Sequence, residues 1–229
     1  MGKILLKNIV SDGVVSDILI ADDRIASVSP AGCEKPSGHD EECEVVDCTG
    51  MTAMPGLVNM HTHAAMSMMR GVGEDIFFHE WIDRIWDIES KIDEEYVYHA
   101  TRVACLEMIK TGTTTFNDHY WHMPMGYKAA MEMGLRCGLA YVICDRNDPV
   151  ESERQKIQCR EMYEYSRQWG HMAQFVIAIH AIYSVSEPLL VWAVDFAREH
   201  GLKIHIHVSE TRKEVQDCMA QHGGMSPVE

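Results

Sequence analysis

Apolar and polar residues follow two different patterns along the chain, and the change falls near residue 55. Before it, short stretches with the two-residue period of β-strands are separated by turn signals such as Asp12-Gly13. The strands expected there cover residues 4–9, 17–21, 24–28 and 44–47. Residues 1–54 are therefore predicted to form a small β-sandwich segment. The stretch from Cys33 to Cys43 is expected to be a mobile loop, and a zinc site at Cys33, His39 and Cys43 is the less favoured interpretation of it.

After residue 55, strand-like and helix-like stretches alternate. Strands are expected near 57–62, 113–118, 135–144, 175–181 and 203–209, and helices at 93–110, 125–133, 151–169 and 187–200. The helix at 93–110 has Asp93 as its candidate N-cap and a stop signal at Gly112. Repeated strand–helix units predict an α/β fold with a parallel sheet. Because only five such units are present, residues 55–229 are expected to be an incomplete (β/α)₈ TIM-type barrel, truncated after the fifth βα unit.

Two histidines stand at the end of the first strand of this region. Residues 57–63 read Leu-Val-Asn-Met-His-Thr-His. Side chains two positions apart in a strand project to the same side, so His61 and His63 can bind one metal ion together. Imidazole suits Zn²⁺ or Fe²⁺. The alternative is that two surface histidines simply lie at a strand end.

A second group of polar residues ends the last predicted strand, which reads Lys-Ile-His-Ile-His-Val-Ser-Glu over residues 203–210. His205 and His207 share one strand face, so spacing alone leaves open which of them binds a metal. His207 is nearer the strand end and is favoured, while His205 is expected to be packed or to support a ligand. Glu210 lies where a carboxylate could take a proton from an activated water and pass it to a leaving amine. The alternative for Glu210 is a capping or first-turn residue of the next helix.

Composition limits the kinds of partner. Lys and Arg total 20 and Asp and Glu total 35, and the net charge of −15 argues against nucleic acid or an anionic membrane as partner. No stretch approaches the roughly 20 apolar residues of a membrane span, and the first residues do not resemble a signal peptide. The 8 cysteines are scattered without the spacing of a disulfide framework. A cytoplasmic protein that acts on a small molecule is expected.

Several motifs occur in the order in which a known family carries them. They are Met54 to His63, Met69-Arg70-Gly71, Glu80-Trp81-Ile82, Ile85 to Glu89, Gly112 to Asp118, His180 to Ser184, and His207 to Glu210. With these motifs the chain resembles the amidohydrolase superfamily, and within it the group of the triazine hydrolases and the 5-methylthioadenosine/S-adenosylhomocysteine deaminases. The resemblance runs from end to end of the chain but covers only the N-terminal portion of a family member.

The resemblance implies a metal-dependent aminohydrolase that deaminates an adenine-type nucleoside, such as 5'-methylthioadenosine or S-adenosylhomocysteine. His61, His63 and His207 would hold one divalent metal ion, with Zn²⁺ favoured over Fe²⁺; three protein ligands and an open position are typical of a catalytic site. Glu210 would act as the proton shuttle, protonating the ring nitrogen as water attacks the carbon that carries the amine.

The resemblance also implies substrate-binding residues. Glu89 would accept hydrogen bonds from the ribose hydroxyls, and its alternative is a solvated acid at a helix start. His180 would contact the purine ring, and its alternative is a core histidine satisfied by a neighbouring strand. Arg146 and Arg154 are candidates for binding a homocysteine carboxylate. His119 and His122 line the pocket mouth or belong to a loop.

Two other functions stay open. One is hydrolysis of another amino- or halo-substituted heterocycle, such as a triazine. The other is an inactive fragment, because the sixth-strand histidine and the eighth-strand aspartate of the family have no counterpart here. On that view the 229-residue chain alone is expected to be inactive, and to self-associate through the open edge of its fifth strand.

Overall fold

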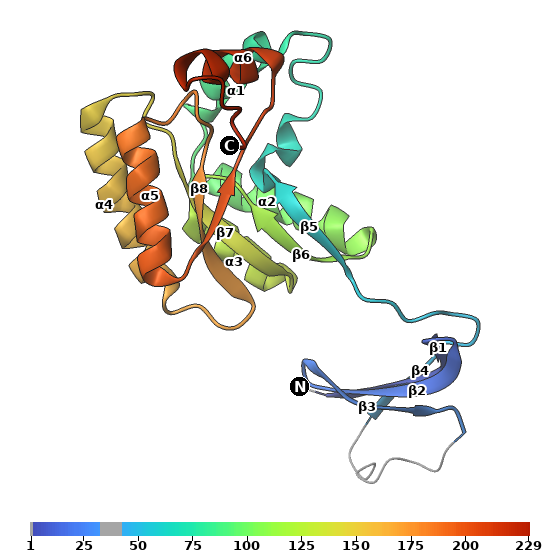
Figure 1. Ribbon diagram of the computed structural model, residues 1–229. Helices are drawn as coiled ribbons and strands as arrows, with labels where there is room; N and C mark the ends of the chain where they lie inside the picture. The colour runs from blue at the N-terminus through green and yellow to red at the C-terminus, as the bar shows by residue number, and fades with distance from the viewer. Residues whose placement is uncertain (1, 33–42) are drawn as a thin grey trace. The chain divides into compact units, whose positions relative to one another are not determined.

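The computed structural model describes residues 2–32 and 43–229, which divide into two compact units (Figure 1). The first unit ends at Pro55, and the second runs from Gly56 to Glu229. The loop expected between Cys33 and Cys43, and with it the zinc site considered there, lies outside the described residues except for Cys43 itself.

The first unit is a four-stranded sheet with the order β3-β2-β1-β4. Strand β1 pairs with β2 in antiparallel and with β4 in parallel orientation, and β2 pairs with β3 in antiparallel orientation. All four predicted strands are present, and a small core forms around Ile9, Ile18 and Cys48. A sandwich needs a second sheet, so it stays a prediction. The strands are β1 (Lys3–Ser11), β2 (Val14–Ala21), β3 (Arg24–Pro30) and β4 (Cys43–Asp47).

The second unit is a five-stranded sheet with the order β5-β6-β7-β8-β9, in which all neighbouring strands are parallel. Helices connect the successive strands, as the repeated pattern predicts. The strands are β5 (Leu57–Thr62), β6 (Thr113–Asp118), β7 (Arg136–Ile143), β8 (Ala173–Ile179) and β9 (Lys203–Ile206). The helices are the 3₁₀ helix η1 (Ala64–Met69), α1 (Phe78–Glu89), α2 (Glu94–Lys110), α3 (Met123–Met133), α4 (Pro149–Ser166), α5 (Glu187–His200) and α6 (Arg212–Gln221).

The sheet of the second unit is strongly curled. Its two edge strands, β5 and β9, are four strand spacings apart, which in a flat sheet would separate them by about 19 Å. Yet Nδ1 of His61 on β5 lies 2.7 Å from Nε2 of His205 on β9. The five strands therefore form an open half-barrel.

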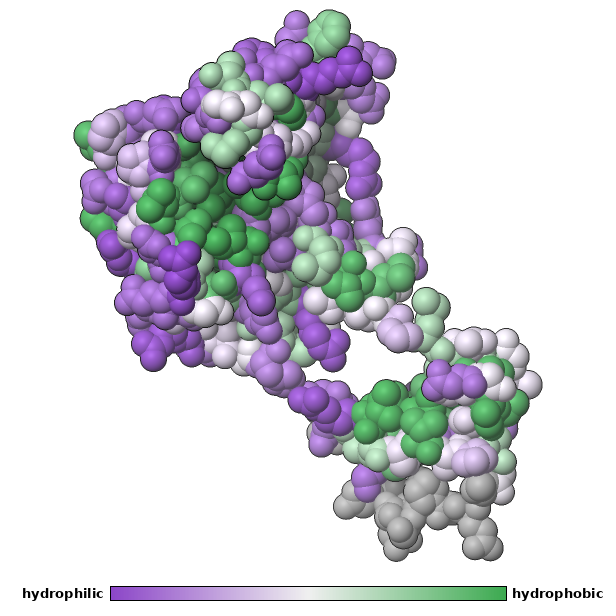
Figure 2. Space-filling view, viewed as in Figure 1, coloured by the Kyte–Doolittle hydropathy of each residue, from purple (hydrophilic) through white to green (hydrophobic). Residues whose placement is uncertain are grey.

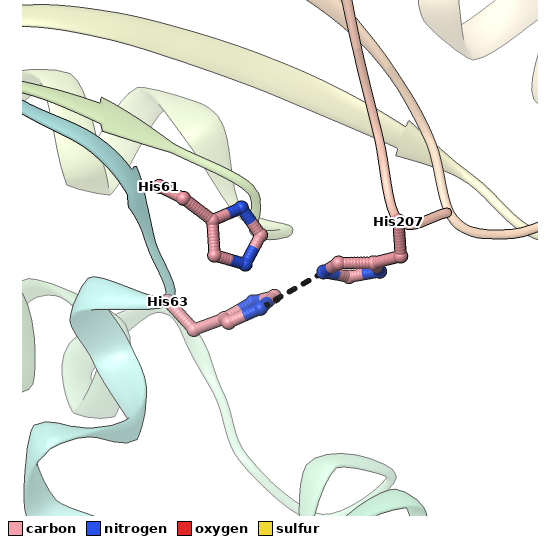
Figure 3. Close-up of side chains that lie close together, drawn as sticks. All are labelled: His61, His63 and His207. Carbon is pink, nitrogen blue, oxygen red and sulfur yellow. Dashed lines mark hydrogen bonds between the residues drawn. The ribbon is translucent and has the colours of Figure 1, made fainter. Parts of the chain in front are cut away.

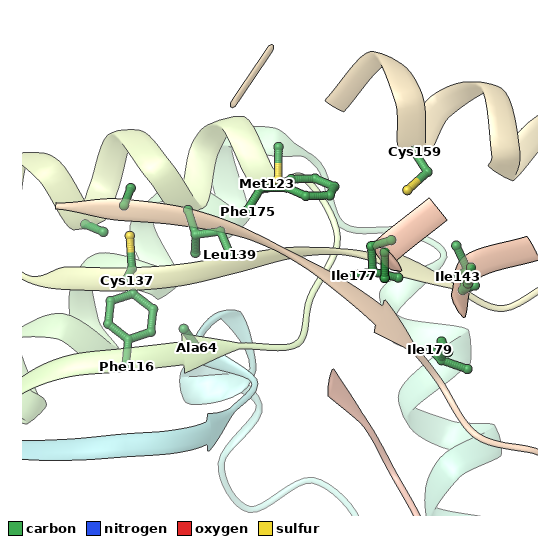
Figure 4. Close-up of a cluster of buried hydrophobic side chains, with 14 of the residues drawn as sticks. Ala64, Phe116, Met123, Cys137, Leu139, Ile143, Cys159, Phe175, Ile177 and Ile179 are labelled. Atoms are coloured by element: carbon green, nitrogen blue, oxygen red, sulfur yellow. The ribbon is translucent and has the colours of Figure 1, made fainter. Parts of the chain in front are cut away.

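The main core lies between this sheet and the helices outside it (Figure 4). Phe116, Leu139 and Ile177 face the helices, where Leu189 of α5 packs among them. The opposite, concave face is also apolar, since it buries Ala140, Val142, Val176 and Ala178. Burial on both faces explains why these strands are nearly continuous apolar runs.

Strand β9 ends earlier than predicted, at Ile206 instead of residue 209. The backbone turns away at Ser209, whose φ is +60°. The N–H groups of Ser209 and Glu210 donate to the carboxylate of Glu214, at 3.0 and 2.7 Å, and not to a neighbouring strand. The end of β9 is thus released from the sheet to form a loop. In the part of the chain that the structure describes, no helix is long and apolar enough to cross a membrane.

Candidate active site

Three imidazoles converge at the C-terminal ends of the two edge strands (Figure 3). His61 and His63 come from the end of β5, and His207 follows β9. The three ring centroids lie 5.0 to 5.1 Å from one another, and one nitrogen of each ring lies within 4.8 Å of the others. The structure therefore brings together the three residues that the sequence predicts as metal ligands.

A hydrogen bond fixes which nitrogen of His63 is free to bind a cation. Its Nδ1 lies 2.7 Å from the carbonyl oxygen of His119, which can only accept, so Nδ1 carries the hydrogen and Nε2 keeps its lone pair. Nε2 of His63 lies 3.2 Å from Nε2 of His207. Two nitrogens on a tetrahedral zinc ion, each about 2.0–2.1 Å from it, lie about 3.3 Å apart. The pair therefore has nearly the spacing that a shared ion requires.

The donor set fits a metal ion in other respects as well. Burial, together with the nearby His207 and His61, lowers the pKa of His63 to about 3. Burial also lowers the pKa of His207. At neutral pH these imidazoles are uncharged, which is the form that binds metals.

One cavity brings the histidines together with the other predicted site residues. It is lined by two of the three candidate ligands, by the carboxylates of Glu89 and Glu210, and by a set of aromatic and apolar side chains. The lining residues are His63, Met66, Trp81, Ile82, Ile85, Trp86, Glu89, His119, Trp121, His180, His207 and Glu210. A larger hollow of about 440 Å³ is lined by residues of β5 to β9, but no carboxylate and no predicted site residue lines it.

Glu210 sits on the loop that the carboxylate of Glu214 fixes. Glu214 is 5 % exposed and accepts hydrogen bonds from two successive backbone N–H groups of this loop, one of them that of Glu210. The side chain of Glu210 accepts a hydrogen bond of 2.8 Å from the hydroxyl of Tyr183. The capping alternative for Glu210 is wrong, since Thr211 is the N-cap of α6 and Glu214 is the acid of its first turn.

Glu89 is the last residue of α1, so the alternative that it is a solvated acid at a helix start is wrong. Its carboxylate lines the cavity, where burial raises its pKa to about 7. Trp86, one turn earlier, lies under the guanidinium of Arg146, 4.2 Å from the ring centroid. Arg146 thus packs against one of the lining residues without lining the cavity itself. Arg154 points along α4 and pairs with Glu151.

His180 follows the last residue of β8 and is 7 % exposed. Its Nδ1 lies 2.6 Å from the hydroxyl of Ser184, and that hydroxyl donates to the carbonyl of Ala181. Nδ1 of His180 is therefore satisfied within its own loop, and not by a neighbouring strand as the alternative held. Burial is the main cause that lowers the pKa of His180 to about 4, so its ring is neutral.

His119 directly follows β6 and lies outside any strand or helix, as the loop interpretation of it predicts. It is 2 % exposed and lies inside the site, with its ring centroid 4.2 Å from that of His207. It therefore lines the cavity itself instead of its mouth. Its position directly after the end of β6, like those of the other site residues after their strands, is the signal that could have placed it. His122, by contrast, does not line the cavity.

Comparisons with known proteins agree with this geometry. The model of the amidohydrolase family matches residues 52–229. A 5'-deoxyadenosine deaminase of Methanoregula boonei is 42% identical over 224 residues, which are 96% of this chain and 50% of the relative. A 5-methylthioadenosine/S-adenosylhomocysteine deaminase of Thermococcus kodakarensis is 37% identical over 219 residues, covering 95% of this chain and 50% of the relative. The chain thus spans about half the length of the curated relatives it matches.

The fold is also similar to a solved structure. An adenosine deaminase from Xanthomonas campestris with bound zinc superposes with a TM-score of 0.82 at 25% identity, over 99% of this chain and 53% of that one. The resemblance expected from the sequence motifs is confirmed by the family match and by these relatives. The chain belongs to the amidohydrolase family.

Proposed function

We propose that the protein containing this chain is a metal-dependent aminohydrolase that removes the amine from an adenine-type nucleoside. The observation that carries the proposal is one cavity lined by two of the candidate ligands, His63 and His207, and also by Glu210, Glu89 and His180. Each supplies a different part of the chemistry: nitrogen ligands, a proton carrier and contacts for the two halves of a nucleoside. The deaminases of adenosine-type nucleosides among the relatives support this substrate class.

One divalent ion would be held by His61, His63 and His207. Neutral imidazoles suit zinc, and the zinc in the Xanthomonas campestris deaminase favours Zn²⁺ over Fe²⁺. Such an ion lowers the pKa of water and so supplies a nucleophile at neutral pH.

Glu210 would move the proton. Its carboxylate faces the same cavity as His63 and His207, so it can take a proton from the attacking water and deliver it to the ring nitrogen of the base. The bond from Tyr183 to Oε2 holds the side chain and leaves Oε1 free for this transfer.

Glu89 and His180 would bind the two halves of the substrate. A carboxylate that accepts from two neighbouring hydroxyls suits the ribose. His180 lies beside Trp86, with ring centroids 5.8 Å apart, and the two rings offer an edge and a face to a planar base.

The five strands are proposed to correspond to the first five strands of a (β/α)₈ barrel. In such a barrel the active site lies at the C-terminal ends of the strands. The candidate site residues of this chain lie at that end of β5, β6, β8 and β9, together with the end of α1.

The runner-up function is hydrolysis of another heterocycle, such as a triazine. In that function Glu89 would have no substrate group to bind, because a triazine has no ribose hydroxyls to donate to its carboxylate. The test is ammonia release from 5'-deoxyadenosine, 5'-methylthioadenosine, S-adenosylhomocysteine and an amino-triazine. Turnover of the triazine alone would reject the nucleoside proposal.

Replacing both His61 and His63 by alanine should abolish metal binding, since it removes two of three ligands. We expect about one Zn²⁺ or Fe²⁺ per chain before the change and little after it, by elemental analysis of the purified protein. The exposed His99 of α2 offers a matched control, because His99→Ala should keep the metal. Undiminished metal in the double variant would contradict the assignment.

The variant Glu210→Gln should lose about 10²–10⁴-fold in kcat and keep its metal, because the amide preserves the shape of the side chain but cannot carry a proton. Glu199→Gln, an exposed change on α5, is the control and should leave kcat unchanged. A loss of less than about tenfold would assign the proton transfer to another group.

Glu89→Gln should raise KM for 5'-deoxyadenosine and have little effect on KM for 2',5'-dideoxyadenosine, which lacks one of the two ribose hydroxyls.

The pH dependence of KM gives a second test of Glu89. Because the pKa of Glu89 is about 7, the ionised carboxylate that accepts hydrogen bonds from both hydroxyls forms as the pH rises. KM for the ribose substrate should therefore fall between about pH 6 and 8, and this fall should disappear in Glu89→Gln. Glu80→Gln, on an exposed part of α1, is the control. An equal effect on both substrates would exclude the ribose role.

Self-association is proposed through the sheet edges. Among the described strands, β5 and β9 each have one neighbour, and their exposed residues include Val58 and Ile204. Figure 2 shows apolar side chains gathered on one face of this unit within a largely hydrophilic surface. Light scattering of the 229-residue chain should give a mass above that of one copy, and Ile204→Lys should reduce it. Val191→Lys on α5 should not, and a monomeric unaltered chain would contradict the proposal.

A further inference from the structure

A chain of hydrogen-bonded side chains lies on the side of His61 that faces away from the other candidate ligands. Nε2 of His205 lies 2.7 Å from Nδ1 of His61, and Nδ1 of His205 lies 3.0 Å from Nδ2 of Asn117. The three residues come from β5, β9 and β6, and both His205 and Asn117 are half-buried.

His205 and His61 do not have the spacing of two ligands of one ion. Two nitrogens bound to the same tetrahedral zinc lie about 3.3 Å apart. A separation of 2.7 Å is that of a hydrogen bond. His205 therefore acts on His61 itself.

The neighbouring strand leaves space for the side chain of Asn117 beside His205. The partner of Asn117 in the register of β6 and β7 is Gly138, and a Cβ atom at Gly138 would collide with the amide oxygen of Asn117. The amide group also donates from Nδ2 to the carbonyl of Met60, at 3.3 Å. These contacts keep the side chain of Asn117 beside His205, with Nδ2 toward both Met60 and His205.

We propose that His205, held by Asn117, is a positioning residue that sets which ring nitrogen of His61 carries the hydrogen. The inference rests on the metal site proposed above. Nε2 of His61 can bind an ion only when the hydrogen is on Nδ1, which then donates to Nε2 of His205. His205 then carries its own hydrogen on Nδ1 and needs an acceptor. Asn117 supplies it by turning its amide oxygen toward His205, which gives up the bond from Nδ2 to Met60.

The opposite order of hydrogen bonds opposes metal binding. When Nδ2 of Asn117 donates to His205, Nε2 of His205 donates to Nδ1 of His61, and the hydrogen of His61 moves to Nε2. The orientation of one amide therefore selects between a ligating and a non-ligating form of His61.

The first test measures the Zn²⁺ affinity of the 229-residue chain by competition with a chromogenic chelator. His205→Leu should weaken binding about 10–100-fold, the usual effect of removing the partner of a ligating histidine. His205→Gln, whose amide oxygen can accept from His61, should restore most of the affinity. His99→Leu is the matched control for a lost surface histidine. Unchanged thermal unfolding midpoints of the metal-free variants would show that each is folded.

The second test uses the direction of the hydrogen bonds. Asn117→Asp provides a group that only accepts, which favours the ligating form of His61, so affinity should rise about tenfold. In a protein that also carries His205→Leu, Asn117→Asp should give no gain in Zn²⁺ affinity. A gain that persists there would mean direct attraction between carboxylate and cation, and would overturn the inference. So would a His205→Leu variant that binds as tightly as the unaltered chain. Failure of the unaltered chain to bind Zn²⁺ would instead reject the metal site, and the inference with it.

Discussion

Two histidine pairs, His61 with His205 and His63 with His207, join the first and last strands of the curled sheet. His61 and His63 are two residues apart at the end of one strand, and His205 and His207 at the end of the other. Both imidazoles of each strand therefore project to the concave side of the sheet. A shift of either strand by one residue would turn its two imidazoles toward the helices. The register of β9 on β8, with Ile206 opposite Ile179, is therefore what brings the candidate ligands together.

Burial then determines the charge of the site. It is the main cause that lowers the pKa of His205 and His180 to about 4, and it raises the pKa of Glu89 and Asp118 to about 7. Both effects favour the neutral forms, because a charge is poorly solvated inside the protein. A divalent cation placed among the histidines would be the largest charge in the cavity. The exposed Glu210 carries the negative charge that could respond to it.

The sequence predicts much of the barrel unit, because its strands and helices carry clear local signals. The predicted bounds of β5, β6 and α5 agree with the structure, and α5 has Pro188 at its start and Gly201 at its end. Helix α1 was not predicted, since it begins after Phe77, whose side chain cannot cap it. Helix α6 was expected only as the next helix after Glu210, without bounds, although Thr211 and Glu214 have the spacing of a capping box.

The candidate site was harder to predict than the strands. The metal-ligand motif is local, but the positions of Glu89 and His119 depend on how α1 and the end of β6 turn toward the cavity. The relation between His205 and His61 depends on the curl of the whole sheet. Local patterns contain none of this information, since these contacts join residues far apart in the chain.

The separation of 144 residues within each histidine pair has a consequence for folding. During synthesis β5 emerges first, and its two imidazoles lack their histidine partners until β9 has been made and has paired with β8. Contacts between such distant residues form slowly, because a long loop must close before they are gained. The cluster is therefore among the last parts of this unit to assemble. Any cation that needs all three rings can bind only after the strands between them are in place, so its uptake marks the end of folding.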